Sequence, residues 1–312
     1  MRILITGGTG YIGYSFVKKL LSMGDMVEKI IVYDNLSRKN YTFFTTGMVI
    51  PGKVSFIHGD IFDSHKLKEV MTGVDLVCHL AAKVITPYAE GDFHQFDQIN
   101  NWGTAIVTDL VEALKIPQFI YLSSLSVYGD HVEPVLETSA TYPNTNYGKS
   151  KLMGEEHVKR LQDETRVFIL RSGNVYGFNP AMRLDSVINK MMFEACFNHK
   201  VYIYGDGHQQ RAFVHVDTVA EALTGLITRE IQPATYNLVE YNYSVNDVLY
   251  FLKEIFPELE YRYISPELVL KSISAEFPCK IASLIEFRPK TFEEELLDFK
   301  AHLISQPLPS PG

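Results

Sequence analysis

The 312-residue sequence has few cysteines and no long apolar run. Cys78, Cys196 and Cys279 stand alone without C-x-x-C spacing, which argues against a disulfide framework and predicts a reduced, cytoplasmic protein. No apolar run reaches the length of a membrane span, and the chain enters a strand at once, without the charged and apolar regions of a secretory leader. We therefore expect neither a membrane protein nor a secreted one.

Basic runs and metal-ligand spacings are also lacking. The net charge is −8 and no Lys/Arg-rich run occurs, whereas a surface that binds nucleic-acid phosphates needs a basic face. The ten histidines show no spacing of the H-E-x-x-H kind, so no metal site is expected. The length allows one large or two moderate domains with a sizeable core.

What the sequence does have is a glycine-rich opening. Apolar residues 3–5 predict a short strand, and the glycines after it fit G-x-G-x-x-G or G-x-x-G-x-x-G, using Gly7, Gly8, Gly10 and Gly13. Glycine permits a tight turn close to a pyrophosphate, and a helix N-terminus offers free N–H groups to the anion. Helical apolar spacing from Tyr11 predicts that helix, with Gly24 as its C-terminal cap.

A carboxylate at the end of the second expected strand supports a dinucleotide site. The strand spans Lys29 to Tyr33, and Asp34 follows about 20 residues after the last glycine, where such folds hold the adenosine ribose hydroxyls. Asp34 favours NAD, because a second anion would repel the extra phosphate of NADP. Arg38 and Lys39 follow closely and leave NADP open.

Strands and helices alternate through the first half of the chain. We expect further strands at 54–58, 74–80, 118–123 and 166–171. Two long helices are expected at 96–114 and 147–162. The inner side of the first long helix is expected to carry Ile99, Ile106, Leu110 and Leu114. This order predicts an α/β fold, a doubly wound parallel sheet of the Rossmann type, with ligands at the carboxyl ends of the strands.

Several residues at those strand ends are candidates for the cofactor site. Asp60 is placed to accept a hydrogen bond from the adenine amino group. Ala81 and Ala82 are small enough for the chain to run against a cofactor, although such pairs also occur in plain cores. His79 is expected to be a packed core residue, and Asp63 a helix N-cap.

The regular alternation of expected strands and helices ends at Asn174. Residues 1–173 are expected to form the Rossmann domain, rejoined by about 212–230, and residues 174–305 a smaller C-terminal α/β cap that closes over a substrate. Residues 306–312, rich in proline, are expected to be a flexible tail. The connection 35–53 carries Phe43 and Phe44 either as a cover over the adenosine or as an ordinary surface excursion.

Tyr147 and Lys151 lie four residues apart, on one face of an expected helix. A nearby ammonium favours the phenolate, so the phenol can take a proton from a hydroxyl while hydride leaves the same carbon for a nicotinamide. The pair follows a strand that ends in Ser123 and Ser124. Ser124 is placed either to hydrogen-bond the reacting oxygen or merely to cap a turn.

At this point the chain resembles the extended short-chain dehydrogenases/reductases, the group of nucleotide-sugar epimerases and dehydratases. The matching pieces occur in family order between residues 3 and about 222. They are Gly7–Gly13, Asp34–Ser37, Gly59–Asp60, His79–Ala82, Ser123–Gly129, Tyr147–Lys151, Arg171–Gly177 and Gly205–Arg211.

The resemblance implies roles for individual residues. It implies a catalytic triad of Ser124, Tyr147 and Lys151, with Lys151 also bridging the nicotinamide ribose and Asn100 steadying the nearby main chain. It implies cofactor contacts at Gly7, Gly10, Tyr11, Ile12, Gly13, Asp34, Asn35, Ser37, Asp60, Ile61, Leu80, Ala81, Ala82, Lys83, Asn100, Tyr147 and Lys151. It places the substrate at Lys83, Ser124, Asn174, Tyr204 and Arg211.

Within the resembled family, sugar dehydratases carry an Asp-Glu pair between the hydroxyl residue and Val-Tyr-Gly, because elimination of water needs its own acid and base. This chain has Leu125 and Ser126 there, and leucine cannot transfer a proton. The arrangement is similar to UDP-galactose 4-epimerase. Arg211 is expected at the nucleotide diphosphate. Arg183 and Arg288 are candidates for a second phosphate contact or ordinary ion-pair residues, and Tyr204 for a nucleobase contact or core packing.

Three hypotheses follow. The first is an NAD-dependent nucleotide-sugar epimerase that acts through a transient keto intermediate, in carbohydrate biosynthesis. The second is a net reductase or dehydrogenase of a sugar or other hydroxy compound, and the third a non-catalytic cofactor-binding protein. The resemblance also suggests a homodimer, joined as a four-helix bundle through helices at 96–114 and 147–162, although these helices can equally pack within one subunit.

Overall fold

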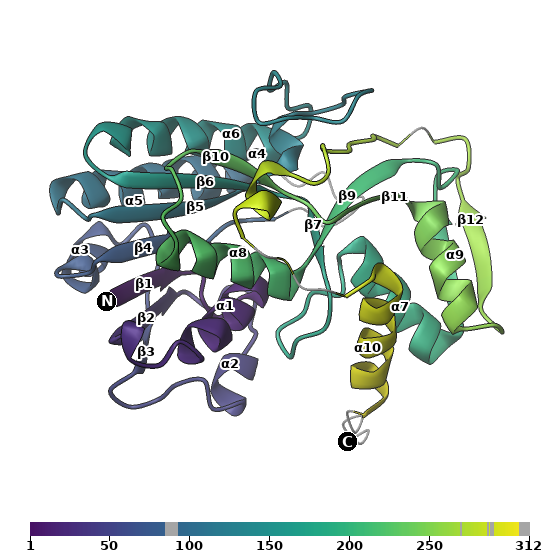
Figure 1. Ribbon diagram of the computed structural model, residues 1–312, viewed down its shortest axis with the longest axis horizontal. Helices are drawn as coiled ribbons and strands as arrows, with labels where there is room; N and C mark the ends of the chain where they lie inside the picture. The colour runs from purple at the N-terminus through teal and green to yellow at the C-terminus, as the bar shows by residue number, and fades with distance from the viewer. Residues whose placement is uncertain (85–92, 269, 286, 288–289, 306–312) are drawn as a thin grey trace.

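The computed structural model describes residues 1–84, 93–268, 270–285, 287 and 290–305. Within these ranges a parallel seven-stranded sheet forms the larger half of the molecule, in the order β10-β6-β5-β4-β1-β2-β3 (Figure 1). Its strands are β1 (Arg2–Thr6), β2 (Lys29–Asp34), β3 (Val54–His58), β4 (Leu76–His79), β5 (Gln118–Ser124), β6 (Arg166–Ser172) and β10 (Thr235–Leu238). The predicted doubly wound parallel α/β fold is confirmed.

Helices cover both faces of this sheet, which explains why its central strands are apolar on both sides. On one face α1 (Tyr11–Leu21) packs against α8 (Val216–Thr228); on the other lie α3 (Ser64–Met71), α5 (Gly103–Ala113) and α6 (Asn146–Lys159) (Figure 1). Shorter helical segments connect them: η1 (Gly24–Met26), α2 (Thr42–Thr45), α4 (Phe93–Phe96), η2 (Asp97–Trp102), η3 (Leu125–Val127) and η4 (Arg160–Asp163).

Side-chain caps fix where two of these helices begin. Asp63, the expected N-cap, accepts a hydrogen bond of 3.0 Å from the backbone N–H of Lys66 at the start of α3. Thr145 caps α6 through a 3.0 Å bond from Gly148 N–H. Because α6 begins at Asn146, Tyr147 lies in its first turn and faces the carboxyl edge of the sheet.

The remaining residues build a smaller half with its own core. It contains β7 (Asn174–Tyr176), α7 (Val187–Asn198), β8 (Lys200–Tyr204), β9 (Gln210–His215), β11 (Tyr241–Ser244), α9 (Val245–Ile255), β12 (Glu260–Ile264) and α10 (Phe292–Ser305). The short helix η5 (Lys280–Ser283) packs instead on β10 of the larger half. In the smaller half β9 pairs with β7 and β11, and β8 pairs with β12. Aromatic rings around Phe292 fill the interior of this half.

The two halves are not consecutive in the sequence. After β9 the chain returns to the large sheet through α8 and β10, as far as Leu238 and beyond the expected limit near residue 230. The division at residue 173 stays a prediction, and the expected tail at 306–312 lies outside the described residues.

Local expectations were wrong at several places. The strand expected at 74–80 is limited to Leu76–His79. Helix α1 ends at Leu21 with Ser22 as its cap, whereas Gly24 starts a separate turn. Phe43, expected either as a cover over the adenosine or in a surface excursion, is fully buried in the core. The helix expected at 96–114 begins with the π-helical η2, and its fully buried residues are Thr104, Val107 and Val111. Of the four residues expected on its inner side, Ile99, Leu110 and Leu114 pack partly buried against the core, whereas Ile106 does not belong to that cluster.

Candidate active site

The glycine loop after β1 leaves a cradle at the carboxyl edge of the sheet. Gly7 has φ +71°, and a Cβ atom there would lie 2.6 Å from the backbone nitrogen of Ala81. A Cβ on Gly13 would lie 2.6 Å from the Cα of Gly8. At Gly10, the N-cap of α1, a Cβ would meet only Gly7 O, at 3.2 Å. The loop is therefore closed toward the protein and open at the helix N-terminus, which suits a pyrophosphate.

Asp34 fixes the end of β2 beside this loop. Its carboxylate accepts hydrogen bonds from Thr9 N–H, at 3.1 Å, and from Leu36 N–H, at 2.9 Å. The carboxylate is thus held between the glycine loop and the following turn while remaining partly exposed. This is the position that the ribose role requires.

Asp60 and Asn35 join the ends of β2 and β3. Asn35 Nδ2 donates to Asp60 Oδ2 at 2.8 Å, and Asp60 Oδ1 accepts from Phe62 N–H at 3.0 Å. The Asn35 side chain also accepts from Ser37 N–H at 3.0 Å. The expected adenine-side residues therefore form one connected rim, beside the buried Ile61.

Other expected cofactor residues serve the fold with their side chains. The Tyr11 phenol is buried and donates to Gly177 O, and Asn189 donates to it at 3.3 Å. Ile12 and Leu80 pack against the apolar core. The buried Tyr11 phenol, with both partners in the protein, leaves the backbone of Tyr11 for any contact with a dinucleotide.

Asn100 holds the chain that leaves β4. Its side chain accepts from Lys83 N–H at 2.8 Å and donates to Lys83 O at 2.9 Å, as well as to Ser150 Oγ at 3.0 Å. Asn100 is 1% exposed, and its contacts join η2, α6 and the strand end. The Lys83 side chain stays exposed at the rim.

Ser124 and Tyr147 come together at the end of β5. The Ser124 hydroxyl hydrogen-bonds the Tyr147 side chain. Burial raises the pKa of Tyr147, whereas the Arg183 guanidinium and the Ser124 bond lower it. Ser124 also caps η3, where its Oγ accepts from Ser126 N–H at 3.2 Å and from Ser126 Oγ at 2.9 Å. The two alternatives for Ser124, reacting-site residue and turn cap, are thus compatible.

Lys151 lies one turn further along α6 and is 2% exposed. Its Nζ stands 4.0 Å from the centre of the Tyr121 ring. Burial lowers the pKa of Lys151 to about 7, and the Glu155 carboxylate opposes that shift. The electrostatic partner of this ammonium is therefore Glu155.

A buried charged network beneath the site was missed from the sequence. Arg171 donates to both carboxylate oxygens of Glu155, at 2.6 and 2.9 Å, and Ser123 Oγ donates to Glu155 at 2.6 Å. Arg171 also donates to the Tyr128 hydroxyl at 2.8 Å. Glu155 lies four residues after Lys151, a spacing that was the one available signal.

Three of the residues expected around a substrate, Asn174, Tyr204 and Arg211, lie on the smaller half, whereas Lys83 and Ser124 lie on the larger one. Asn174 begins β7 and donates to Ala212 O at 3.2 Å, and Arg211 donates to Gln210 O at 3.2 Å. Tyr204 ends β8 and is partly buried, with Lys190 Nζ 5.5 Å from its ring centre. Arg183 forms a bidentate pair with Asp185 at 2.7 and 2.9 Å. Arg288 lies outside the described residues.

His79 is a core residue, as expected. Its ring is 1% exposed and bonds the hydroxyls of Thr6, at 2.6 Å, and Thr104, at 3.2 Å. Burial and the nearby Lys151 ammonium lower its pKa to about 3. A neutral, doubly bonded imidazole of this kind joins β1, β4 and α5.

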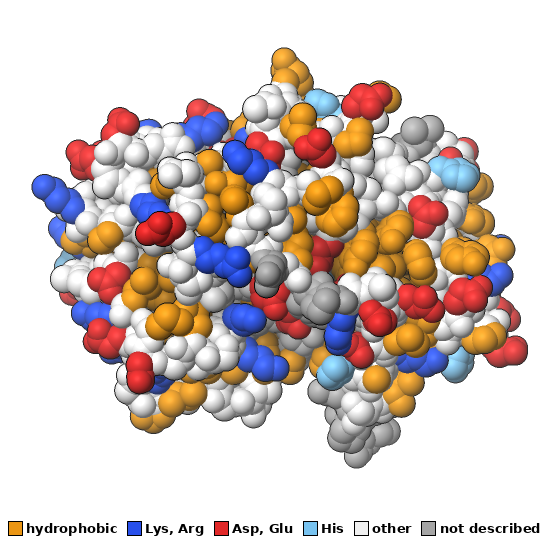
Figure 2. Space-filling view, in the orientation of Figure 1, with side chains coloured by type: hydrophobic (Ala, Val, Ile, Leu, Met, Phe, Trp, Pro, Cys, Tyr) orange, Lys and Arg blue, Asp and Glu red, His pale blue; other side chains and the backbone are white. Residues whose placement is uncertain are grey.

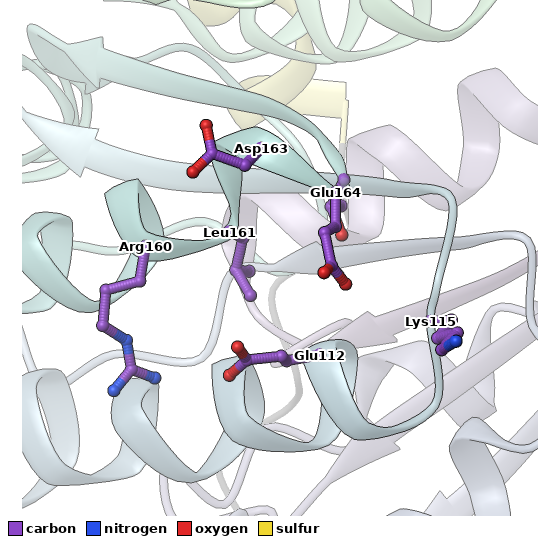
Figure 3. A pocket seen from close by; sticks show the side chains of 7 residues that line it. Glu112, Lys115, Arg160, Leu161, Asp163 and Glu164 are labelled. Atoms are coloured by element: carbon purple, nitrogen blue, oxygen red, sulfur yellow. The ribbon is translucent and has the colours of Figure 1, made fainter.

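A separate hollow of 230 Å³ lies at the opposite edge of the sheet, before β5 and β6 (Figure 3). Charged side chains line much of it, including Glu112, Lys115, Arg160 and Glu164. Since ligands of parallel α/β sheets bind at the carboxyl ends of the strands, this hollow does not belong to the candidate active site.

Three features of the described residues bear on partners: the surface charge, the length of the helices and the grouping of metal-binding side chains. Acidic and basic side chains are interspersed on the face shown in Figure 2. Within the described ranges, no helix is both long and apolar enough for a bilayer crossing. His, Cys, Asp and Glu side chains form no metal-binding group of three in the same ranges. Cytoplasmic location stays a prediction.

Comparison with known proteins places this site in a family. Residues 3–238 match the NAD dependent epimerase/dehydratase family. The chain is 31% identical over 245 residues to the dTDP-D-glucose 4,6-dehydratase of Mus musculus, covering 76% of this chain and 67% of that protein. It is 33% identical over 228 residues to a Methanocaldococcus jannaschii protein provisionally named UDP-glucose 4-epimerase, covering 70% and 71%.

The fold comparison agrees. MoeE5 in complex with UDP-glucose and NAD superposes with a TM-score of 0.83 and 25% identity, over 97% of this chain and 99% of that one. The fold is also that of UDP-glucuronic acid 4-epimerase from Bacillus cereus, with a TM-score of 0.84, 23% identity, and coverage of 97% and 100%. With the glycine loop, Asp34 and the Ser124–Tyr147 pair in place, the chain belongs to the NAD dependent epimerase/dehydratase family.

Proposed function

We propose that this protein is an NAD-dependent epimerase of a nucleotide-activated sugar. The observation that carries the proposal is the segment between Ser124 and Tyr128. Leu125 is 2% exposed within an apolar cluster, and the Ser126 hydroxyl is bonded to Ser124. Neither residue can act as the separate acid and base that elimination of water needs. This argues against dehydration, although a dehydratase is among the similar proteins.

NAD held by the glycine loop and Asp34 would supply the hydride chemistry, in which hydride is removed from a sugar carbon and returned to its other face. Tyr147 is proposed to take the hydroxyl proton as the keto group forms and to give it back at the end. Ser124 donates a hydrogen bond toward the reacting oxygen. Lys151, held by Glu155, would bind the ribose hydroxyls.

The cradle of the glycine loop fits the pyrophosphate of the cofactor, and Asp34 fits its adenosine ribose. We further propose that the substrate lies between the two halves, with its diphosphate at Arg211 and its nucleotide near Tyr204 and Asn174. The binding of UDP-glucose by the similar protein MoeE5 supports a nucleotide sugar as the substrate class.

The test is incubation of the pure protein with NAD and a panel of UDP-, GDP-, CDP- and dTDP-sugars. An epimeric product of unchanged mass, without a sustained change in absorbance at about 340 nm, supports the proposal. A product lighter by one water would show a dehydratase instead. Sustained absorbance change would show the alternative, a net reductase or dehydrogenase.

Matched variants connect that activity to the proposed residues. Tyr147→Phe is expected to reduce kcat at least about 100-fold, because the proton acceptor is lost. Tyr142→Phe is its control, since Tyr142 is 75% exposed on the neighbouring loop. Lys151→Met should be compared with Lys149→Met on the exposed side of the same helix. An unimpaired kcat in Tyr147→Phe contradicts the mechanism, and a biological role left untouched by Tyr147→Phe in a protein without epimerase activity favours the non-catalytic hypothesis.

We also propose a homodimer formed through η2, α5 and α6. Trp102 is 60% exposed and Met153 41% exposed, and Ile99, Ile106 and Leu110 remain only partly buried along the same elements. Large side chains in such positions favour a second copy of the helical pair as their cover.

A further inference from the structure

The end of β5 carries a hydrogen-bond arrangement that the reaction scheme above does not use. Ser124 is the last residue of the strand, and η3 begins at Leu125. Ser126, two residues on, directs both its N–H and its hydroxyl at Ser124 Oγ, at distances of 3.2 and 2.9 Å. Leu125 and Val127 are 2% and 0% exposed, so the short helix is anchored on both sides of Ser126.

This arrangement limits what the Ser124 hydroxyl can do. A serine oxygen has two acceptor lone pairs and one proton. The Ser126 N–H can only donate to Ser124 Oγ, and with the Ser126 hydroxyl donating as well, the two bonds occupy both acceptor positions. The proton is then the one part of Ser124 left for the Tyr147 side chain, with which Ser124 is hydrogen-bonded.

We propose that Ser126 is a positioning residue that makes Ser124 an obligate hydrogen-bond donor toward Tyr147. The proposal rests on the proposed function, because it gives a direction to a bond within the proposed catalytic pair. Without the Ser126 hydroxyl, Ser124 Oγ regains an acceptor position and can accept a hydrogen bond from the Tyr147 hydroxyl. Tyr147 would then be stabilised as a donor, which is the wrong state for taking a proton from a substrate.

The surroundings of Tyr147 add fixed influences that a change at Ser126 leaves in place. The charge of Arg183, on the smaller half, lowers the pKa of Tyr147, and the Phe96 ring packs against the Tyr147 ring with centres 6.2 Å apart. Each of these groups belongs to an element other than η3. A change in Tyr147 ionisation after substitution of Ser126 would therefore report the Ser124 bond.

The experiment compares Ser126→Ala with Ser126→Thr, which restores a hydroxyl, in the NAD-loaded protein. Tyrosine labelled with ¹³C at Cζ is followed by NMR against pH, and the Tyr147 signal is assigned by its loss in Tyr147→Phe. Ser126→Ala is expected to raise the pKa of Tyr147 by about half a unit. The acid limb of the pH profile of kcat/KM should move to higher pH by the same amount. Ser126→Thr should match the wild type.

Further variants keep the result decisive. Ser283→Ala, in the exposed short helix η5, is the control and should change nothing. If Ser126→Ala does not fold, Ser126→Cys takes its place, because a thiol keeps the volume but donates weakly. The proposal is overturned if the pKa of Tyr147 is unchanged in the alanine or cysteine variant. It is also overturned if the threonine variant shifts that pKa as much as the alanine variant does. If no sugar is epimerised, the proposed function fails, and the NMR titration still decides the role of Ser126.

Discussion

Replacement of Glu155 by glutamine is expected to be the most damaging conservative change beneath the candidate active site. The Glu155 side chain is 0% exposed and pairs with Arg171, which is 5% exposed. Glutamine keeps the shape but removes the negative charge. It leaves the Arg171 guanidinium buried without a counter-ion, and the Ser123 hydroxyl with a weaker acceptor.

The magnitude follows from the cost of a buried, uncompensated charge. Removing one partner of a buried ion pair costs about 3–5 kcal/mol of unfolding free energy. At about 2.1 cal/mol/K per residue, the unfolding entropy of a chain of 312 residues makes this a fall of about 5–8 °C in the thermal midpoint. The estimate applies if the whole chain unfolds in one transition.

The assay is urea and thermal unfolding followed by far-UV circular dichroism at pH 7. Glu156→Gln is the control, because Glu156 is 65% exposed in its pair with Lys159 and should cost less than about 0.5 kcal/mol. The double variant Glu155→Leu with Arg171→Met is expected to recover most of the loss. The reasoning is refuted if Glu155→Gln unfolds within about 1 kcal/mol of Glu156→Gln.

Three further outcomes are expected. Gly13→Ala should lose cofactor affinity and about 1–3 kcal/mol of stability, because its Cβ would lie 2.6 Å from Gly8. The control Gly24→Ala should leave cofactor affinity unchanged, and calorimetric NAD titration with urea unfolding checks both variants. Because the pKa of His79 is lowered to about 3 in the native protein, only the unfolded chain binds a proton there between pH 6.5 and 3. The unfolding free energy should therefore fall as the pH decreases through this range, by up to about 1.4 kcal/mol per pH unit. His79→Gln should remove that slope, and parallel pH profiles of the two proteins in urea unfolding would contradict the prediction. Trp102→Asp should convert a dimer to a monomer by light scattering, and an unchanged mass would speak against the proposed interface.

Local patterns predicted the cofactor half of the fold well. The strand, glycine loop, helix and second strand up to Asp34 lie where the sequence placed them, because glycine conformation and apolar periodicity are properties of neighbouring residues. The edge strand β10 was not predicted. Its four residues, Thr235–Leu238, become a strand through pairing with β6, some sixty residues earlier in the chain.

Two site features depended on contacts that a sequence does not display. The π-helical η2 adds width to the helix before α5 and rotates the residues that follow, so Val107 and Val111 are fully buried while Leu110 packs only partly buried against the same core. The Glu155–Arg171 pair was missed because charged residues are usually exposed, and the spacing of Glu155 from Lys151 was the one local feature that separates it from the exposed Glu156.

The buried lysine shows how function and stability diverge in this site. The pKa of Lys151 is about 7 in the folded chain and about 10.5 when unfolded, so the unfolded chain binds more protons between these values and stability rises as the pH increases from 7 to 10.5. At neutral pH the lysine therefore destabilises the fold, and Glu155 offsets only part of that effect. A methionine would fill the same space above the Tyr121 ring without this cost. An ammonium held there against the folding free energy is the pattern of a residue kept for its chemistry.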